Sequence, residues 1–216
     1  MDHANIYRIF AALLSYPEQE LLDALEELKP MLSPSQWQDL SPLFAQLEAE
    51  PLVRTQERYV ETFDRNPSHS LHLFEHIHGE SRDRGQAMVD LLQEYRSAGF
   101  EPCESELPDY VPVFIEFLSV LDHEQAEPLL NDAVHVLAAV GKRLAKNLSP
   151  YAGVFDVLVS FASVEPQDLK EPPVRDMDEA METFGPGADG VEPLLKPQDT
   201  HTIQFHTQRP PLAARV

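Results

Sequence analysis

The stretch NDAVHVLAAVGKRLAKNL, residues 131–148, carries apolar side chains at helical spacing and decides the fold class. Its Val134, Leu137, Val140 and Leu144 recur every three or four residues, so they line one face of an α-helix. A two-residue alternation, which would indicate a β-strand, is scarce here and in the residues around it. The stretch therefore predicts a helix with one buried face.

The same period continues on both sides through the first 164 residues. It predicts further helices over residues 2–14, 17–30, 33–47, 52–63, 68–78, 81–99, 108–121 and 149–161. Prolines at several expected helix starts support these bounds, as do Gly79 and Gly99 at expected ends. Helices joined by short connections predict an all-α, single-domain helical bundle over residues 1–164.

The composition changes near residue 165. Residues 165–216 hold 8 of the 19 prolines but only 2 of the 17 Phe and Tyr residues. So few large apolar groups cannot offset the entropy lost on ordering, which predicts a mostly disordered tail. Met177, Met181 and Phe184 could form one apolar face that fills a ligand groove; the alternative is a plain linker, which we favour.

Net charge narrows the range of partners. The 37 acidic residues exceed the 16 Lys and Arg, which gives a formal net charge of -21. This charge repels nucleic acid and anionic lipid, so we expect no nucleic-acid binding and no direct membrane binding. Cationic partners are favoured, although solubility alone also accounts for an acidic surface. The single cysteine, Cys103, and the lack of a signal-like or membrane-spanning stretch lead us to expect a cytoplasmic protein.

Acidic residues are concentrated between residues 97 and 141, where there are nine of them and no Lys or Arg. They are Glu101, Glu104, Glu106, Asp109, Glu116, Asp122, Glu124, Glu127 and Asp132. The same stretch carries Phe100, Tyr110, Phe114 and Phe117. An acidic rim beside an apolar groove suits a basic amphipathic peptide. Alternatively the aromatic residues are core and the acids face solvent; spacing alone leaves both interpretations open.

Three histidines, His69, His72 and His76, share a face of the predicted helix 68–78. A spacing of four residues can place two imidazoles on one zinc ion, which would suit a metal-dependent helical hydrolase. The alternative, which we favour, is that these histidines pack at a seam between helices and hold no metal. The sequence has no Gly-x-Ser-x-Gly turn and no Gly-rich phosphate loop, so we do not expect an enzyme.

A compact group of charges, Arg82, Asp83 and Arg84, follows Gly79 at the start of a predicted helix. Two arginines there oppose the helix dipole, so acidic partners should hold them. We expect these partners among Asp64, Glu75 and Glu80. The sequence thus predicts a structural clasp between helices, made by Glu75, His76, Arg82, Asp83 and Arg84.

Three motifs together resemble a known family. They are YVETFD at 59–64, SLHLFEHIHGESRDRGQAM at 70–88 and ELPDYVP at 106–112, and LSYP at 14–17 also fits. They are similar to the nitrate reductase molybdenum-cofactor assembly chaperones, the NarJ-type or delta-subunit branch of the TorD-like redox-enzyme maturation proteins. The resemblance extends over about residues 4–163.

The resemblance implies an all-α fold, no catalysis and no cofactor of the protein's own. The implied partner is the catalytic (alpha) subunit of a respiratory nitrate reductase, bound through its leader-like N-terminal segment. The chaperone would keep that subunit in the cytoplasm, competent for insertion of the molybdenum cofactor and an iron–sulfur cluster, before the subunit docks on its membrane anchor. A helical scaffold for another basic partner is the remaining alternative.

The wider group carries a Glu-Pro-x-Asp-His-type motif at a hinge between helices. Its counterparts here are Glu106, Pro108, Asp109 and Tyr110, and tyrosine in place of histidine favours the nitrate reductase branch. Our hypothesis is that the peptide directs its cations to Glu106 and Asp109 and buries its apolar face against Tyr110, Phe114 and Phe117. The predicted peptide-binding residues are therefore Glu106, Pro108, Asp109, Tyr110, Phe114 and Phe117.

Overall fold

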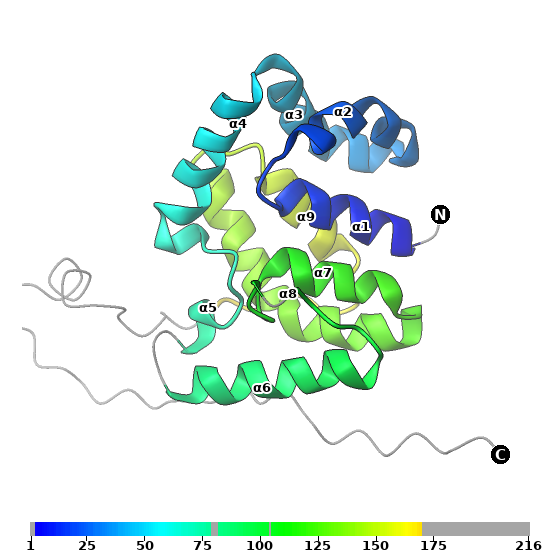
Figure 1. The fold of residues 1–216 in the computed structure, drawn as a ribbon, viewed down its shortest axis with the longest axis vertical. Coiled ribbons are helices and arrows are strands. Elements are labelled where there is room, and N and C mark those ends of the chain that lie inside the picture. Colours follow the sequence, from blue (N-terminus) through cyan, green and yellow to red (C-terminus); the bar gives the residue numbers. More distant parts are fainter. Residues whose placement is uncertain (1–2, 79–81, 104, 170–216) are drawn as a thin grey trace, which may run out of the picture. The chain divides into compact units, whose positions relative to one another are not determined.

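A computed structural model describes residues 3–78, 82–103 and 105–169. Across these residues the regular structure is helical, apart from one isolated β-bridge, so the predicted all-α fold is confirmed (Figure 1). The chain divides into a compact unit, Met1–Pro173, and a second unit, Val174–Val216, which lies outside the described residues together with the predicted tail face at 177–184. No helix within the described ranges is long and apolar enough to cross a membrane.

The helices follow one another with short connections. The α-helices are α1 His3–Leu14, α2 Gln19–Leu28, α3 Pro34–Ala49, α4 Leu52–Tyr59, α5 Glu75–His78, α6 Arg82–Ser97, α7 Val111–Val120, α8 His123–Lys146 and α9 Ala152–Ser160. Short 3₁₀ turns cover Lys29–Met31 and Pro67–His69, and a π-helical turn covers Val60–Asp64.

Helix α7 lies at the centre of the core. Its sequence is apolar on nearly every side, and eight of its ten residues are buried. A helix that is hydrophobic all round must be surrounded by other elements, and α7 packs most extensively against α1. Phe114 and Phe117 are 2% and 1% exposed, so both belong to this core.

Helices α8 and α9 form the second main contact, and α9 also packs on α3. Two glycines allow these close approaches. A Cβ atom added at Gly141 would lie 2.8 Å from Cβ of Phe155, and one added at Gly153 would overlap the backbone carbonyl oxygen of Asp39. The α3–α9 crossing therefore needs a residue without a side chain at position 153.

The predicted helix over 68–78 is wrong. The chain forms a 3₁₀ turn at Pro67–His69 and an irregular loop, and becomes helical again only at Glu75. The loop makes its backbone hydrogen bonds with another segment: Leu73 N–H donates to the Asp109 carbonyl at 3.0 Å, and Val111 N–H donates to the Leu71 carbonyl at 2.7 Å. Pairing with residues 109–111 thus replaces the helical bonds that the spacing suggested.

Helix α8 begins eight residues before the predicted start at residue 131. Asp122 caps it, because its side chain accepts from the Gln125 N–H at 2.9 Å. Pro128 lies inside the helix near its start, where the missing proline N–H removes only one backbone bond. The cap and the apolar face together outweigh that loss.

Past α9 the chain forms a strap, residues 163–169, along α8. Ser163 and Asn131 exchange two hydrogen bonds, and Gln167 N–H donates to His135 Nδ1 at 2.9 Å. Lys142 Nζ pairs with Asp168 at 2.8 Å. The described structure therefore continues past the boundary predicted at residue 164, towards the C-terminal end of α8.

Candidate functional site

The three motifs singled out in the sequence meet in space. His72 and Tyr110 form the isolated antiparallel bridge that joins the 70–74 loop to the 106–110 loop. The π-helical turn Val60–Asp64 follows α4 directly, and its Arg65 N–H bonds back to the Val60 carbonyl at 3.0 Å. Insertions of this kind in a helix are frequent at functional sites. We therefore build the candidate site from these three segments.

Asp109 is buried inside the candidate site and holds its loops together. Its side chain is 0% exposed, and its two carboxylate oxygens have different partners. Oδ2 accepts from the Phe74 N–H at 3.2 Å, and Oδ1 lies 3.2 Å from His72 Nδ1. Arg84 Nη2 lies 3.8 Å from Oδ2 and supplies positive charge. Asp109 thus fixes the 70–74 loop from inside, and does not face a ligand as the sequence hypothesis supposed.

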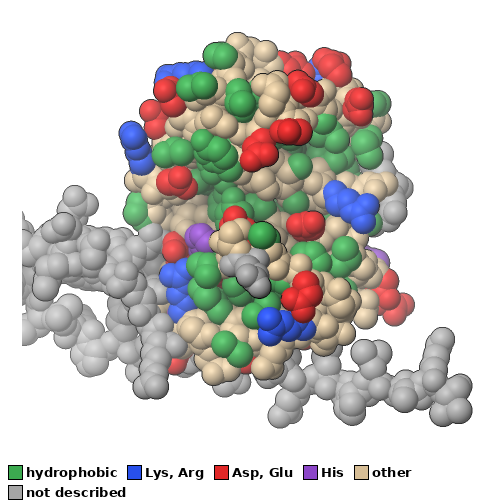
Figure 2. Space-filling model, viewed as in Figure 1, with side chains coloured by type: hydrophobic (Ala, Val, Ile, Leu, Met, Phe, Trp, Pro, Cys, Tyr) green, Lys and Arg blue, Asp and Glu red, His purple; other side chains and the backbone are tan. Residues whose placement is uncertain are grey.

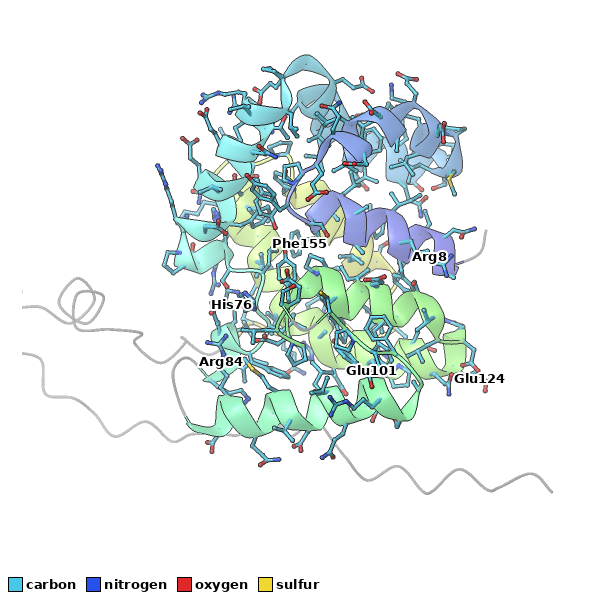
Figure 3. The ribbon with its side chains drawn as sticks, viewed as in Figure 1. Arg8, His76, Arg84, Glu101, Glu124 and Phe155 are labelled. Atoms are coloured by element: carbon cyan, nitrogen blue, oxygen red, sulfur yellow. The ribbon has the colours of Figure 1, made fainter. Side chains whose placement is uncertain are left out.

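Arg84 connects the start of α6 to the same loop. Its Nη2 lies 3.2 Å from Glu75 Oε1, and Glu75 also accepts from the Ser70 hydroxyl. Glu75 is one of the partners expected from the sequence. Figure 3 shows Arg84 near His76, beside α5 and the first turn of α6. The Arg84–Glu75–Asp109 contacts form what we call the clasp.

The other predicted clasp residues have different positions. Asp83 is exposed, and it lies close enough to His78 to raise the pKa of that imidazole, although burial has the larger, lowering effect on the pKa. The side chain of Arg82 lies outside the described residues, as does Glu80. His76 is 3% exposed and belongs to a separate seam.

His69 and His76 hold this seam between the loop and α8. His69 Nδ1 lies 3.0 Å from the Thr62 carbonyl, and its Nε2 lies 2.8 Å from Asn147 Nδ2. His76 Nε2 lies 2.8 Å from the Ser70 carbonyl, and its Nδ1 lies 3.2 Å from Arg143 Nη1. A carbonyl accepts and an amide or guanidinium nitrogen donates, so each ring has one donating and one accepting nitrogen.

That pattern uses both nitrogens of each ring within the protein. His72 does not share their seam, because its Nδ1 points to Asp109. In the described parts of the chain, no group of three His, Cys, Asp or Glu residues is arranged to hold a metal ion. His69 and His76 therefore pack at a seam between elements, as the favoured interpretation predicts, whereas His72 contacts Asp109 instead.

A partly exposed row of rings lies on the outer side of the bridge. Tyr16 and Tyr59 meet edge to face with centroids 5.6 Å apart. The Tyr59 and Tyr110 hydroxyls are 2.8 Å apart, and the Tyr110 and His72 rings have centroids 5.4 Å apart. Tyr16 is 47% exposed, whereas Tyr59 is buried beneath it. We call these four residues the tyrosine surface.

Hydrogen bonds determine which hydroxyl group of the tyrosine surface donates and which accepts. The single hydroxyl proton of Tyr59 goes to the Leu14 carbonyl at 2.8 Å, so Tyr110 must donate its own proton to Tyr59. Burial raises the pKa of both hydroxyls, so both stay protonated at neutral pH. The Tyr110 oxygen then has only lone pairs left. It can accept a hydrogen bond from a ligand but cannot donate one.

Two exposed carboxylates lie near enough to Tyr110 to affect the pKa of its hydroxyl group. Glu106 and Asp64 both act on it electrostatically, and each raises its pKa further. Leu107, between Glu106 and Pro108, is 44% exposed. Figure 2 shows the same mixture over one face of the molecule, with exposed hydrophobic side chains among acidic ones. The local chemistry suits a ligand with both apolar groups and cationic donors.

The predicted peptide-binding residues divide into two groups. Glu106 is exposed and Pro108 and Tyr110 are partly exposed, whereas Asp109, Phe114 and Phe117 are buried and support the surface from below. Sequence reasoning missed Tyr16, Tyr59 and Asp64 as site residues. Their signal was present, since all three lie within the quoted motifs at 14–17 and 59–64.

Comparison with known proteins gives one consistent result. The family model described as "Nitrate reductase delta subunit" matches residues 17–156. The probable nitrate reductase molybdenum cofactor assembly chaperone NarW of Escherichia coli K12 is 40% identical over 158 residues, which are 73% of this chain and 68% of the relative. The chaperone NarJ of the same strain is 39% identical over 162 residues, 72% of this chain and 68% of NarJ. The probable NarJ of Bacillus subtilis is 29% identical over 74% of this chain and 89% of its own.

Proposed function

Because this chain belongs to the nitrate reductase delta subunit family, we propose that it is an assembly chaperone that binds the N-terminal segment of a nitrate reductase catalytic subunit. It acts in the cytoplasm and holds that subunit until the molybdenum cofactor has been inserted, before the subunit docks at the membrane. The cofactor is the client's cargo, and the proposal includes no catalytic step by the chaperone itself. The relatives, which are named as assembly chaperones, support this role.

One observation carries the choice of binding site. At Tyr110 an oxygen that can only accept hydrogen bonds lies beside two exposed carboxylates, Asp64 and Glu106. A leader-like segment offers the complement, since arginine supplies several donors and a positive charge. The exposed edges of Tyr16 and Leu107 give apolar side chains a place to pack. The client segment would therefore lie across the tyrosine surface with its cations towards Asp64 and Glu106.

Titration calorimetry with a synthetic peptide of the client's N-terminal segment tests this placement. The double variant Asp64→Asn/Glu106→Gln removes both exposed carboxylates and keeps their shape. Each exposed charge pair contributes about 0.2–1 kcal/mol, so we expect the loss of two pairs to lower affinity about two- to thirtyfold at low salt. Added salt should shrink the difference between wild type and variant, while binding through apolar contacts persists.

The matched control is Glu20→Gln/Glu27→Gln. It makes the same change in net charge at two exposed residues of α2, neither of which belongs to the tyrosine surface. It should leave the affinity within about twofold of wild type at moderate salt, because only distant screened charges change. Equal losses in the two double variants would show that net charge matters but that the site lies elsewhere.

A further inference from the structure

His72 uses only one of its two ring nitrogens within the described protein. Its Nδ1 lies 3.2 Å from Asp109 Oδ1. Among the residues that the structure describes, none bonds to Nε2, and Nε2 is not one of the buried polar atoms left without a partner. The His72 side chain is 29% exposed. Nε2 therefore faces solvent on the tyrosine surface, where it can bond with a ligand.

Asp109 determines which nitrogen of this ring carries the proton. The other carboxylate oxygen, Oδ2, accepts from the Phe74 N–H at 3.2 Å and lies 3.8 Å from Arg84 Nη2, which leaves Oδ1 to His72. A carboxylate accepts hydrogen bonds and does not donate them, so Nδ1 must be the nitrogen with the proton. In the neutral imidazole, Nε2 then carries a lone pair and can only accept.

A second acceptor lies on the neighbouring ring. His72 and Tyr110 form the antiparallel bridge, and their rings have centroids 5.4 Å apart with planes tilted by 33°. The Tyr110 hydroxyl donates to Tyr59, so its oxygen also has only lone pairs to offer a ligand. The two adjacent rings therefore present two acceptors and no donor to a ligand.

We infer that His72 is a specificity-determining residue whose Nε2 accepts a hydrogen bond from an arginine of the bound client, and that Asp109 is the positioning residue that keeps this nitrogen an acceptor. The inference rests on the proposed function, because the ligand is the client's N-terminal segment. A guanidinium suits two adjacent acceptors, since it presents five N–H donors in one plane and stacks on aromatic rings. A lysine ammonium is a compact point charge without that plane. The surface therefore selects arginine over lysine at one position of the client.

The simplest alternative is that His72 serves only as the internal partner of Asp109. The variant His72→Asn separates the two roles. The asparagine amide can place an N–H where Nδ1 lies, so the bond to Asp109 is kept, but it has no atom at the position of Nε2. Urea denaturation should give a midpoint close to that of wild type. The client peptide should bind about three- to tenfold more weakly, as expected for one lost hydrogen bond.

The matched control is His123→Asn. It makes the same change at an exposed histidine of α8 that does not belong to the tyrosine surface. Its affinity for the client peptide should match that of wild type. Equal affinities in His72→Asn and His123→Asn would overturn the inference.

Replacement of the client's arginines by lysine, one at a time, tests the selectivity. At one position the wild-type chain should lose about three- to tenfold in affinity. His72→Asn should lose clearly less with the same peptide, because its acceptor is already absent. If the loss were the same in both chains at every position, Nε2 would not contact an arginine and the inference would fail.

Nitrogen-15 NMR of the histidine rings in the full chain observes the tautomer directly. At about pH 8.5, where an ordinary imidazole is neutral, His72 should carry its proton on Nδ1. Saturating client peptide should shift the Nε2 signal more than the Nδ1 signal. A proton on Nε2, or an unmoved Nε2 signal in a chain that binds the client peptide, would overturn the inference alone. A wild-type chain that binds no client peptide would overturn the proposed function, and the role of His72 with it.

Discussion

Asp109 and Glu106 lie three residues apart in one motif but have separate tasks. The Asp109 carboxylate is fully buried between the Phe74 N–H, His72 and Arg84, whereas Glu106 is exposed at the rim. Sequence alone suggested that both would meet a client's cations. Burial separates them, because a carboxylate whose neighbours are all internal stabilises the loop and cannot reach a ligand.

Asp109→Asn should therefore destabilise the fold. The change removes the charge that faces Arg84 and replaces an acceptor with an amide that also donates, which costs about 2–4 kcal/mol. Urea denaturation measures this loss. Glu106→Gln on the same loop is the control and should stay within about 0.5 kcal/mol of wild type. An Asp109→Asn protein with the wild-type urea midpoint would contradict the internal role.

Asp156, on α9, gives a pH dependence that can be checked. Burial raises the pKa of its carboxyl group, and nearby Asp39 raises it further. The folded chain therefore binds this proton more tightly than the unfolded chain, so the contribution to stability is fully present below the ordinary aspartate pKa. It is lost as the pH rises through the raised value.

Asp156→Asn should accordingly stabilise the protein at pH 7. The gain should be only about 0.2–0.5 kcal/mol, because Asp156 is exposed and its charge is screened by solvent. Thermal unfolding from pH 7 down to pH 4 follows it, and the gain should shrink as the pH falls. Asp39→Asn removes only the smaller cause of the raised Asp156 pKa, so it should stabilise the protein less. A gain in stability that does not change with pH would show that the raised pKa of Asp156 is not its cause.

At the scale of elements, the α3–α9 crossing depends on Gly153. A methyl group there would overlap the carbonyl oxygen of Asp39, which is backbone and cannot rotate away. Gly153→Ala should therefore cost about 2–3 kcal/mol, the upper part of the range for overpacking a core. Gly85→Ala adds the same methyl in α6, where nothing lies within 4 Å, and should gain up to about 1 kcal/mol from helix propensity. If both variants changed the free energy of unfolding in the same direction relative to wild type, this account would be contradicted.

The helices show which parts of the fold sequence patterns predict and which they do not. Ser33 and Gln36 form a capping box at the start of α3, where the sequence predicts a helix from residue 33, and Gly99 has φ +78 at the end of the α6 segment. The loop at 70–74 was mistaken for helix, because its apolar residues have helical spacing. What decides its shape is pairing with residues 109–111, and no local pattern reports a partner that far away along the chain.

At the scale of the whole molecule, the candidate site likewise depends on contacts between distant segments, which sequence patterns do not report. The motifs identified segments that meet in space, and there Glu106 is exposed and Tyr110 is partly exposed. Spacing could not show that α7 is enclosed on nearly every side, so it predicts a groove at Phe114 and Phe117, although both are buried in the core. It also could not show that Tyr16 and Tyr59 come from distant segments to join Tyr110.

The central claim is that the client's N-terminal segment binds across the tyrosine surface. The most direct measurement is mapping of backbone and aromatic NMR shifts on the full chain as the unlabelled client peptide is added. The account predicts that the largest changes fall on Tyr16, Tyr59, His72 and Tyr110 and on Asp64 and Glu106, with α2 and the start of α3 unchanged. Saturable changes confined to other elements, with the tyrosine surface unmoved, would contradict it.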